Sequence, residues 1–77
     1  MTDIEIIELV KKNAEIYYVE DGDLYKLKIQ YCYVSNKGIN RIYAKNNRVS
    51  KNFKPFRFGI DVFLSYDEAL KAIERKD

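Results

Sequence analysis

The middle of the chain alternates apolar and polar residues, which is the pattern of β-strands with one buried face. The alternation is clearest in residues 23–34, which follow Asp21-Gly22, the strongest short-range signal for a two-residue hairpin turn. A second turn at 35–38 leads into a strand at 39–45, and residues 16–20 supply the strand before the first turn. These segments predict an antiparallel meander.

The region after this meander predicts a loop and a last strand. Residues 46–54 are polar and form the loop, with a short edge strand around Val49. Pro55 cannot donate to a ladder and therefore marks a strand start or a sheet edge. Apolar residues alternate again through 56–62, and Gly59 in the middle of that strand indicates a bulge.

Each end of the chain has the 3.6-residue period of a helix. The first helix is expected over residues 2–13, where Thr2 and Glu5 have the spacing of a capping box. The second begins at Ser65, which has the same spacing to Glu68. The inward face of the first helix is expected to be Ile6, Ile7, Val10 and Ala14. The apolar stripe of the second is Tyr66, Ala69, Leu70 and Ile73, and its basic end is Lys71, Arg75 and Lys76.

These elements predict one α+β domain over residues 1–77, with an antiparallel sheet of three to four strands between the two helices. Both helices are expected on one sheet face, and an SH3-like small barrel with helices is the alternative. Counting from the two turns places Tyr17 and Tyr43 on the other, open face and Arg41 opposite Cys32. On the core face, the same counting pairs Tyr18 with Tyr25, Ile29 with Ala44, and Tyr31 with Ile42.

Charge is unevenly distributed along the chain, although the net charge is only +2. Residues 25–60 hold nine Lys or Arg and no Asp or Glu, whereas residues 1–24 hold seven acids and two bases. A cationic surface of this kind attracts nucleic-acid phosphates or an acidic protein surface. The residues predicted to bind such a partner are Lys26, Lys28, Arg41, Tyr43, Lys45, Arg48, Lys51, Lys54 and Arg57.

The chain lacks the residues that most catalytic and metal sites use. It contains no histidine, the commonest general base and metal ligand, and its three glycines form no phosphate-binding loop. We therefore expect no enzymatic activity, no cofactor, and no catalytic or metal-binding residue. The single cysteine, Cys32, allows no intrachain disulfide, and no apolar run reaches the ~18 residues that span a membrane. A cytoplasmic protein is expected.

Residues 58–70 resemble the ending of small uncharacterised proteins encoded by phages and mobile elements of low-GC Gram-positive bacteria. That ending is roughly Gly-Lys-Thr-Val-Phe-Leu-Thr-Arg-Glu-Glu-Ala-Glu; Ser65 takes the place of its capping Thr, and Ile60 and Asp61 depart from it. The matching residues are Gly59, Val62, Phe63, Leu64, Glu68 and Ala69. The resemblance implies a phage-like accessory protein in a bacterial host cell and brings no catalytic residues. Small phage proteins of this kind include inhibitors of host defence, such as anti-CRISPR proteins.

Our first functional expectation is a non-enzymatic accessory protein that binds an acidic protein surface or a ribonucleoprotein complex of the host through the basic sheet face. Direct binding of nucleic acid by the same face is the alternative, and a solvated face without a ligand is the third. The chain has neither the aromatic signature of an RRM nor a GXXG loop, so no known nucleic-acid module is indicated. A metabolic or structural accessory protein that acts as a homodimer through an exposed strand edge is a further hypothesis.

Overall fold

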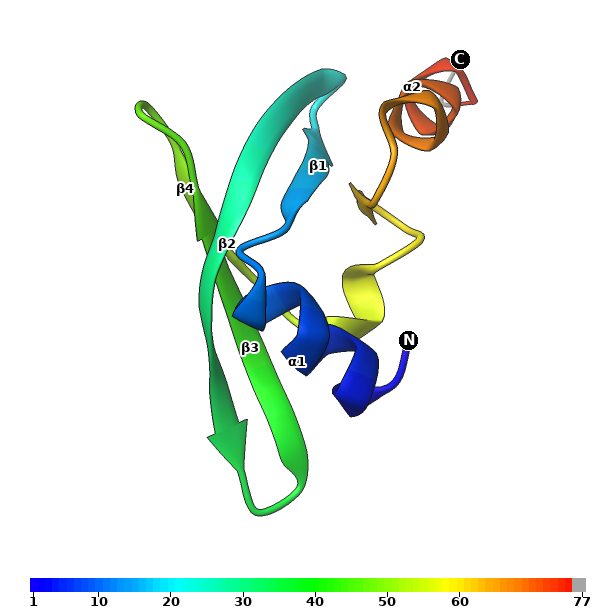
Figure 1. Ribbon diagram of the computed structural model, residues 1–77. Helices are drawn as coiled ribbons and strands as arrows, with labels where there is room; N and C mark the ends of the chain where they lie inside the picture. Colours follow the sequence, from blue (N-terminus) through cyan, green and yellow to red (C-terminus); the bar gives the residue numbers. More distant parts are fainter. Residues whose placement is uncertain (76–77) are drawn as a thin grey trace.

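One antiparallel sheet of five strands, in the order β4-β3-β2-β1-β5, carries the fold (Figure 1). The computed structural model describes residues 1–75, so Lys76 at the expected basic helix end lies outside the described residues. The predicted α+β class is confirmed, with five strands where three to four were expected. The elements are α1 (Asp3–Lys11), β1 (Glu15–Glu20), β2 (Asp23–Ser35), β3 (Gly38–Lys45), β4 (Ser50–Phe53), the 3₁₀ helix η1 (Pro55–Arg57), β5 (Val62–Phe63) and α2 (Tyr66–Glu74).

The local signals at the turn and at both helix starts are confirmed. Asp21 and Gly22 have φ values of 53° and 81°, the two positive angles that a type I′ hairpin turn needs. Thr2 and Glu5 form the reciprocal capping box at the start of α1. Ser65 caps α2 by accepting a hydrogen bond from the backbone N–H of Glu68 at 3.2 Å.

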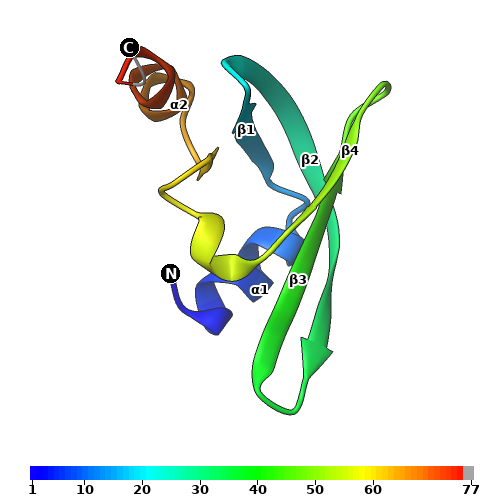
Figure 2. The same cartoon turned by 180° about the vertical axis from the view of Figure 1, so that it is seen from behind.

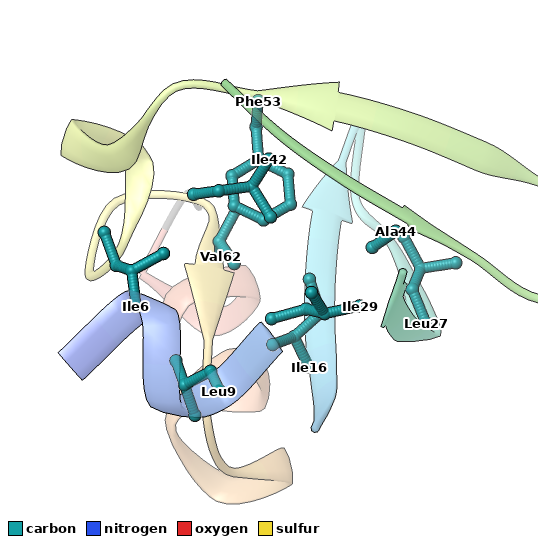
Figure 3. Close-up of a cluster of buried hydrophobic side chains, with 9 residues drawn as sticks. All are labelled: Ile6, Leu9, Ile16, Leu27, Ile29, Ile42, Ala44, Phe53 and Val62. Carbon is teal, nitrogen blue, oxygen red and sulfur yellow. The ribbon is translucent and has the colours of Figure 1, made fainter. Parts of the chain in front are cut away.

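The main core lies between α1 and one face of the sheet (Figure 3). Ile6 and Leu9 of α1 are buried there, whereas Ile7, expected to point inward, is 38% exposed. The helix is therefore rotated from the expected face towards Leu9. The cluster comprises Ile6, Leu9, Ile16, Leu27, Ile29, Ile42, Ala44, Phe53 and Val62.

Helix α2 packs against the opposite face of the sheet, so the prediction that both helices share one face is wrong. Val19 and Phe63 pack with Ala69 of α2 in a second cluster. Their neighbours in the strands, Tyr18 and Val62, face the α1 side. Because successive strand residues point to opposite faces, the short strand β5 contributes one side chain to each core.

The strand predicted over 56–62 is also wrong. Pro55 begins η1 instead, and Gly59 adopts a φ of 88° in the loop that follows. An ion pair between Arg57 and Asp61 spans this loop, and only Val62–Phe63 pair with β1. Phe58 reaches the main core from the loop. Of the apolar residues that alternate here, only Phe58 and Val62 reach the core, whereas Phe56 and Ile60 are exposed.

The register of β2 and β3 follows the prediction as far as Ile29, which opposes Ala44. Gln30 is then passed over in the ladder, so that Tyr31 opposes Tyr43 and Cys32 opposes Ile42. The expected placement of Tyr31 opposite Ile42 on the core face is therefore wrong. A β-bulge of this kind shifts every later residue of the strand to the other face.

Candidate binding site on the open sheet face

The open face is the part of the α2-side sheet surface that α2 leaves uncovered, over β2, β3 and β4. Across the β2–β3 ladder, three pairs of residues lie opposite one another on this face. They are Lys28 with Lys45, Tyr31 with Tyr43, and Tyr33 with Arg41. The face therefore combines cationic and aromatic side chains in adjacent rungs of one ladder.

Tyr31, Tyr33 and Tyr43 form the tyrosine cluster. The rings of Tyr31 and Tyr43 are stacked, with centroids 4.9 Å apart and planes at 25°, and Tyr33 meets Tyr31 edge-on at 5.4 Å. The hydroxyls of Tyr31 and Tyr33 share a hydrogen bond at 3.3 Å, and this bond raises the pKa of Tyr31. Tyr31 and Tyr33 remain 44% and 48% exposed. The cluster is thus a neutral aromatic surface whose members hold one another in place.

Lys28 and Lys45, the lysine pair, lie next to this cluster on neighbouring strands. Like charges directly opposite in a ladder repel each other. Within residues 1–75, neither lysine forms an ion pair with a carboxylate. An anion bound between the two ammonium groups would remove this repulsion.

An open hollow of about 560 Å³ lies beside the lysine pair. Lys26 borders it and pairs with Glu15 at 3.3 Å, but both side chains are more than half exposed, so the ion pair is weak and salt-sensitive. Gln30 borders it too, with its amide held on the Lys28 carbonyl oxygen at 3.0 Å. The polar side chains around the hollow are Glu15, Lys26, Lys28, Gln30, Lys45, Asn46 and Asn47.

Two of the predicted binding residues are engaged away from the open face. Lys51 donates to Glu20 at 2.6 Å and lies 5.5 Å from the ring centre of Tyr18, which packs against the main core. Its hydrogen bond to Glu20 raises the pKa of Lys51. Arg57 is bound by Asp61, which likewise raises the pKa of the guanidinium. Their charges are already compensated within the fold.

The two remaining predicted cations lie at the ends of β4. Arg48 is exposed in the β3–β4 turn, where its backbone N–H donates to Asn46 Oδ1 at 2.7 Å. This turn adjoins the hollow through Asn46. Lys54 follows β4 at its other end, with its amine 3.5 Å from Asn40 Oδ1. Arg48 thus lies in a turn next to the hollow without lining it, and Lys54 lies at the other end of β4.

The prediction missed Tyr31 and Tyr33 on the open face and wrongly included Tyr17. Tyr17 packs edge-on against Tyr66 of α2 at 6.0 Å, because that helix covers its part of the face. Tyr31 and Tyr33 reach the open face only through the bulge at Gln30. No residue type in the sequence marks Gln30 as bulged, so counting alone could not find them.

Comparison of the chain with protein-family models, curated proteins and solved structures finds no match. The resemblance of residues 58–70 to phage proteins therefore stays a prediction. No helix in the part of the chain that the structure describes is long and apolar enough to cross a membrane.

Proposed function

We propose that the protein binds single-stranded nucleic acid on the open face. One observation carries this proposal: the bulge at Gln30 puts Tyr31 and Tyr33 beside Tyr43 on the same face as the lysine pair. Proteins that bind single strands combine cations for the phosphates with aromatic side chains for the bases. Tyr31 and Tyr33 would stack with bases, while Lys28 and Lys45 neutralise phosphates.

The alternation of the two residue types along β3 suits an extended strand. Arg41, Tyr43 and Lys45 are every second residue of that strand, so neighbouring members are about 7 Å apart. A polymer that lies along β3 meets a cation, an aromatic ring and a second cation in turn. Bases in a duplex are already stacked on each other, so this surface favours unpaired bases.

A second candidate partner is an acidic protein surface on a host complex, which retains the predicted role of an accessory protein or inhibitor. The observation in its favour is that Tyr31 already stacks with Tyr43, so that ring face is occupied. Tyrosine edges and hydroxyls beside cations are also typical of protein interfaces, where Tyr and Arg are enriched. The same lysine pair would then meet carboxylates.

Fluorescence anisotropy with three labelled probes separates these partners. The probes are oligothymidylate, a duplex of the same length, and a polyglutamate peptide of similar charge. The proposal predicts that the single strand binds most tightly and that its affinity falls linearly on a log–log plot against salt. Equal or tighter binding of polyglutamate would favour the protein partner, and no binding of oligothymidylate at low salt would refute the proposal.

A further inference from the structure

The β2–β3 hairpin extends well beyond the other strands as a two-stranded arm (Figures 1 and 2). We define the arm as residues 30–41. β1 pairs with β2 only as far as Lys28, and β4 pairs with β3 only from Ile42 onward. Both outer edges of the arm therefore lie outside the five-stranded part of the sheet.

Ile29 is the residue of β2 at which the hydrogen bonds between its outer edge and the rest of the chain end. The Ile29 N–H donates to the Ala14 carbonyl oxygen at 2.9 Å, and its carbonyl oxygen accepts from Asn13 Nδ2 at 3.0 Å. Among the described residues, no strand pairs with Gln30–Ser35 on this side. The β3 side of the arm differs, because Asp3 at the start of α1 accepts a hydrogen bond from the Ile39 N–H at 3.3 Å.

This free edge lacks the features by which proteins prevent strands from pairing with one another. Such features are charged side chains, especially Lys, and Pro. Residues 29–35 contain no charged residue, no Pro and no Gly, and Val34 is 70% exposed. Uncharged segments of this length and high β-propensity pair readily with another strand.

The edge at β4 provides a contrast within the same sheet. β4 is only four residues long, carries Lys51, and is followed by Lys54 and Pro55. Its edge is therefore short, charged and closed by a residue that cannot donate. The difference between the two edges indicates that the β2 edge is a pairing surface.

We propose that two copies of this chain pair antiparallel through Tyr31–Ser35, about a two-fold axis at Tyr33, and join their sheets into one. Antiparallel pairing of a strand with its own copy is self-complementary, which is the requirement of a two-fold interface. Because residues 30–35 are uncharged, the pairing opposes no like charges. This inference stands independently of the proposed nucleic-acid binding.

The position of the axis follows from what already occupies the edge. With the axis at Tyr33, Tyr31 lies opposite Ser35 of the second copy, and the ladder ends where Asn36 enters the turn, well before Ile29. An axis at Cys32 would place Ser35 of the second copy opposite Ile29, where Ala14 and Asn13 are already bound. An axis perpendicular to the sheet also keeps both open faces on one side, so the two tyrosine clusters become neighbours.

A charge-swap experiment tests both the dimer and its axis. Tyr33→Lys and Tyr33→Glu each place like charges opposite each other, so each variant alone should be monomeric by sedimentation equilibrium. An equimolar mixture should form the heterodimer, visible by native mass spectrometry, because Lys and Glu then lie directly opposite. Tyr33→Phe should dimerise like the wild type.

A second pair of variants avoids the tyrosine cluster. Val34→Lys adds a cation to the proposed ladder and should lower the dimer association constant at least about tenfold. Asn36→Lys adds the same charge in the adjacent turn and should have a much smaller effect. A wild type that stays monomeric at millimolar concentration would overturn the proposal, and so would Val34→Lys dimerising as well as Asn36→Lys. Circular dichroism shows whether a Tyr33 variant is unfolded. If one is, the comparison of Val34→Lys with Asn36→Lys tests the dimer in its place.

Discussion

Tyr31 stacks on Tyr43 across the β2–β3 ladder, with ring centroids 4.9 Å apart. This contact exists because Gln30 is passed over in the ladder, which brings the next residue of β2 opposite Tyr43. Without the bulge, Tyr31 would point into the core beside Ile42 and the open face would have little aromatic surface. The bulge therefore determines the chemistry of the candidate site.

Replacing Tyr31 by Ala should weaken binding of oligothymidylate. Loss of one stacking side chain costs about 1–3 kcal/mol per base, which is roughly a 5- to 150-fold loss of affinity. Tyr31→Phe keeps the ring and should retain most of the affinity. Tyr66→Ala removes a similarly exposed tyrosine from α2 and serves as the control in the same anisotropy titration. Equal affinity of Tyr31→Ala and wild type would exclude stacking at this position.

Neutralising the lysine pair should weaken binding without weakening the fold. In Lys28→Gln/Lys45→Gln two phosphate contacts are lost, so the slope of log K against log salt should fall by about 1.4. The mutual repulsion of Lys28 and Lys45 is lost as well, so the free energy of unfolding in urea should stay equal or rise.

The control for this variant is Lys11→Gln/Lys12→Gln, which removes the same charge near the end of α1, away from the open face. It should leave the salt slope close to that of the wild type. A lysine-pair variant with an unchanged slope would mean that other cations hold the phosphates.

Deletion of Gln30 should be tolerated, because this residue has no partner in the β3 ladder. The chain would then run from Ile29 directly to Tyr31, and both residues would keep their present partners and faces. Deletion of Lys28 should be far more damaging, since it breaks the alternation on which the core of β2 depends. Thermal unfolding ranks the two deletions, and ring-to-ring NOEs between Tyr31 and Tyr43 report whether the stack survives. Loss of these NOEs in a folded Gln30 deletion would contradict the register.

The sequence patterns predicted the local features of the fold but not those that depend on tertiary contacts. The Asp21-Gly22 turn and the Thr2 capping box rest on neighbouring residues, and both are present. The bulge at Gln30 follows directly on Ile29, whose backbone is hydrogen-bonded to the chain before β1, a tertiary contact that no local pattern encodes. The position of α2 depends on the two-residue strand β5, which is too short to have a detectable period. The lysine pair was therefore predictable, whereas the tyrosine cluster was not.

Part of the free energy of unfolding should depend on Tyr18 and be lost at alkaline pH. Burial, reinforced by the carboxylates of Asp61 and Glu20, raises the pKa of Tyr18. The folded state thus favours the neutral phenol, and this contribution is complete below the pKa of an unfolded tyrosine. It is lost as the pH rises through the higher pKa of the folded state. We would measure the free energy of unfolding in urea at a series of alkaline pH values, and we expect Tyr18→Phe to lose less of it than the wild type as the pH rises. If the two proteins lose the same amount, the assignment to Tyr18 is wrong.

Chemical-shift mapping by NMR tests the central claim most directly, because it locates the bound strand on the molecule. Titration of the isotope-labelled protein with oligothymidylate at low salt should shift the resonances of Tyr31, Tyr33 and Tyr43 together with those of the lysine pair. Resonances of α1 and of the α2 surface away from the sheet should stay in place. Shifts confined to α1 or to the β4 edge, or no shifts at all, would contradict the open face as the binding site.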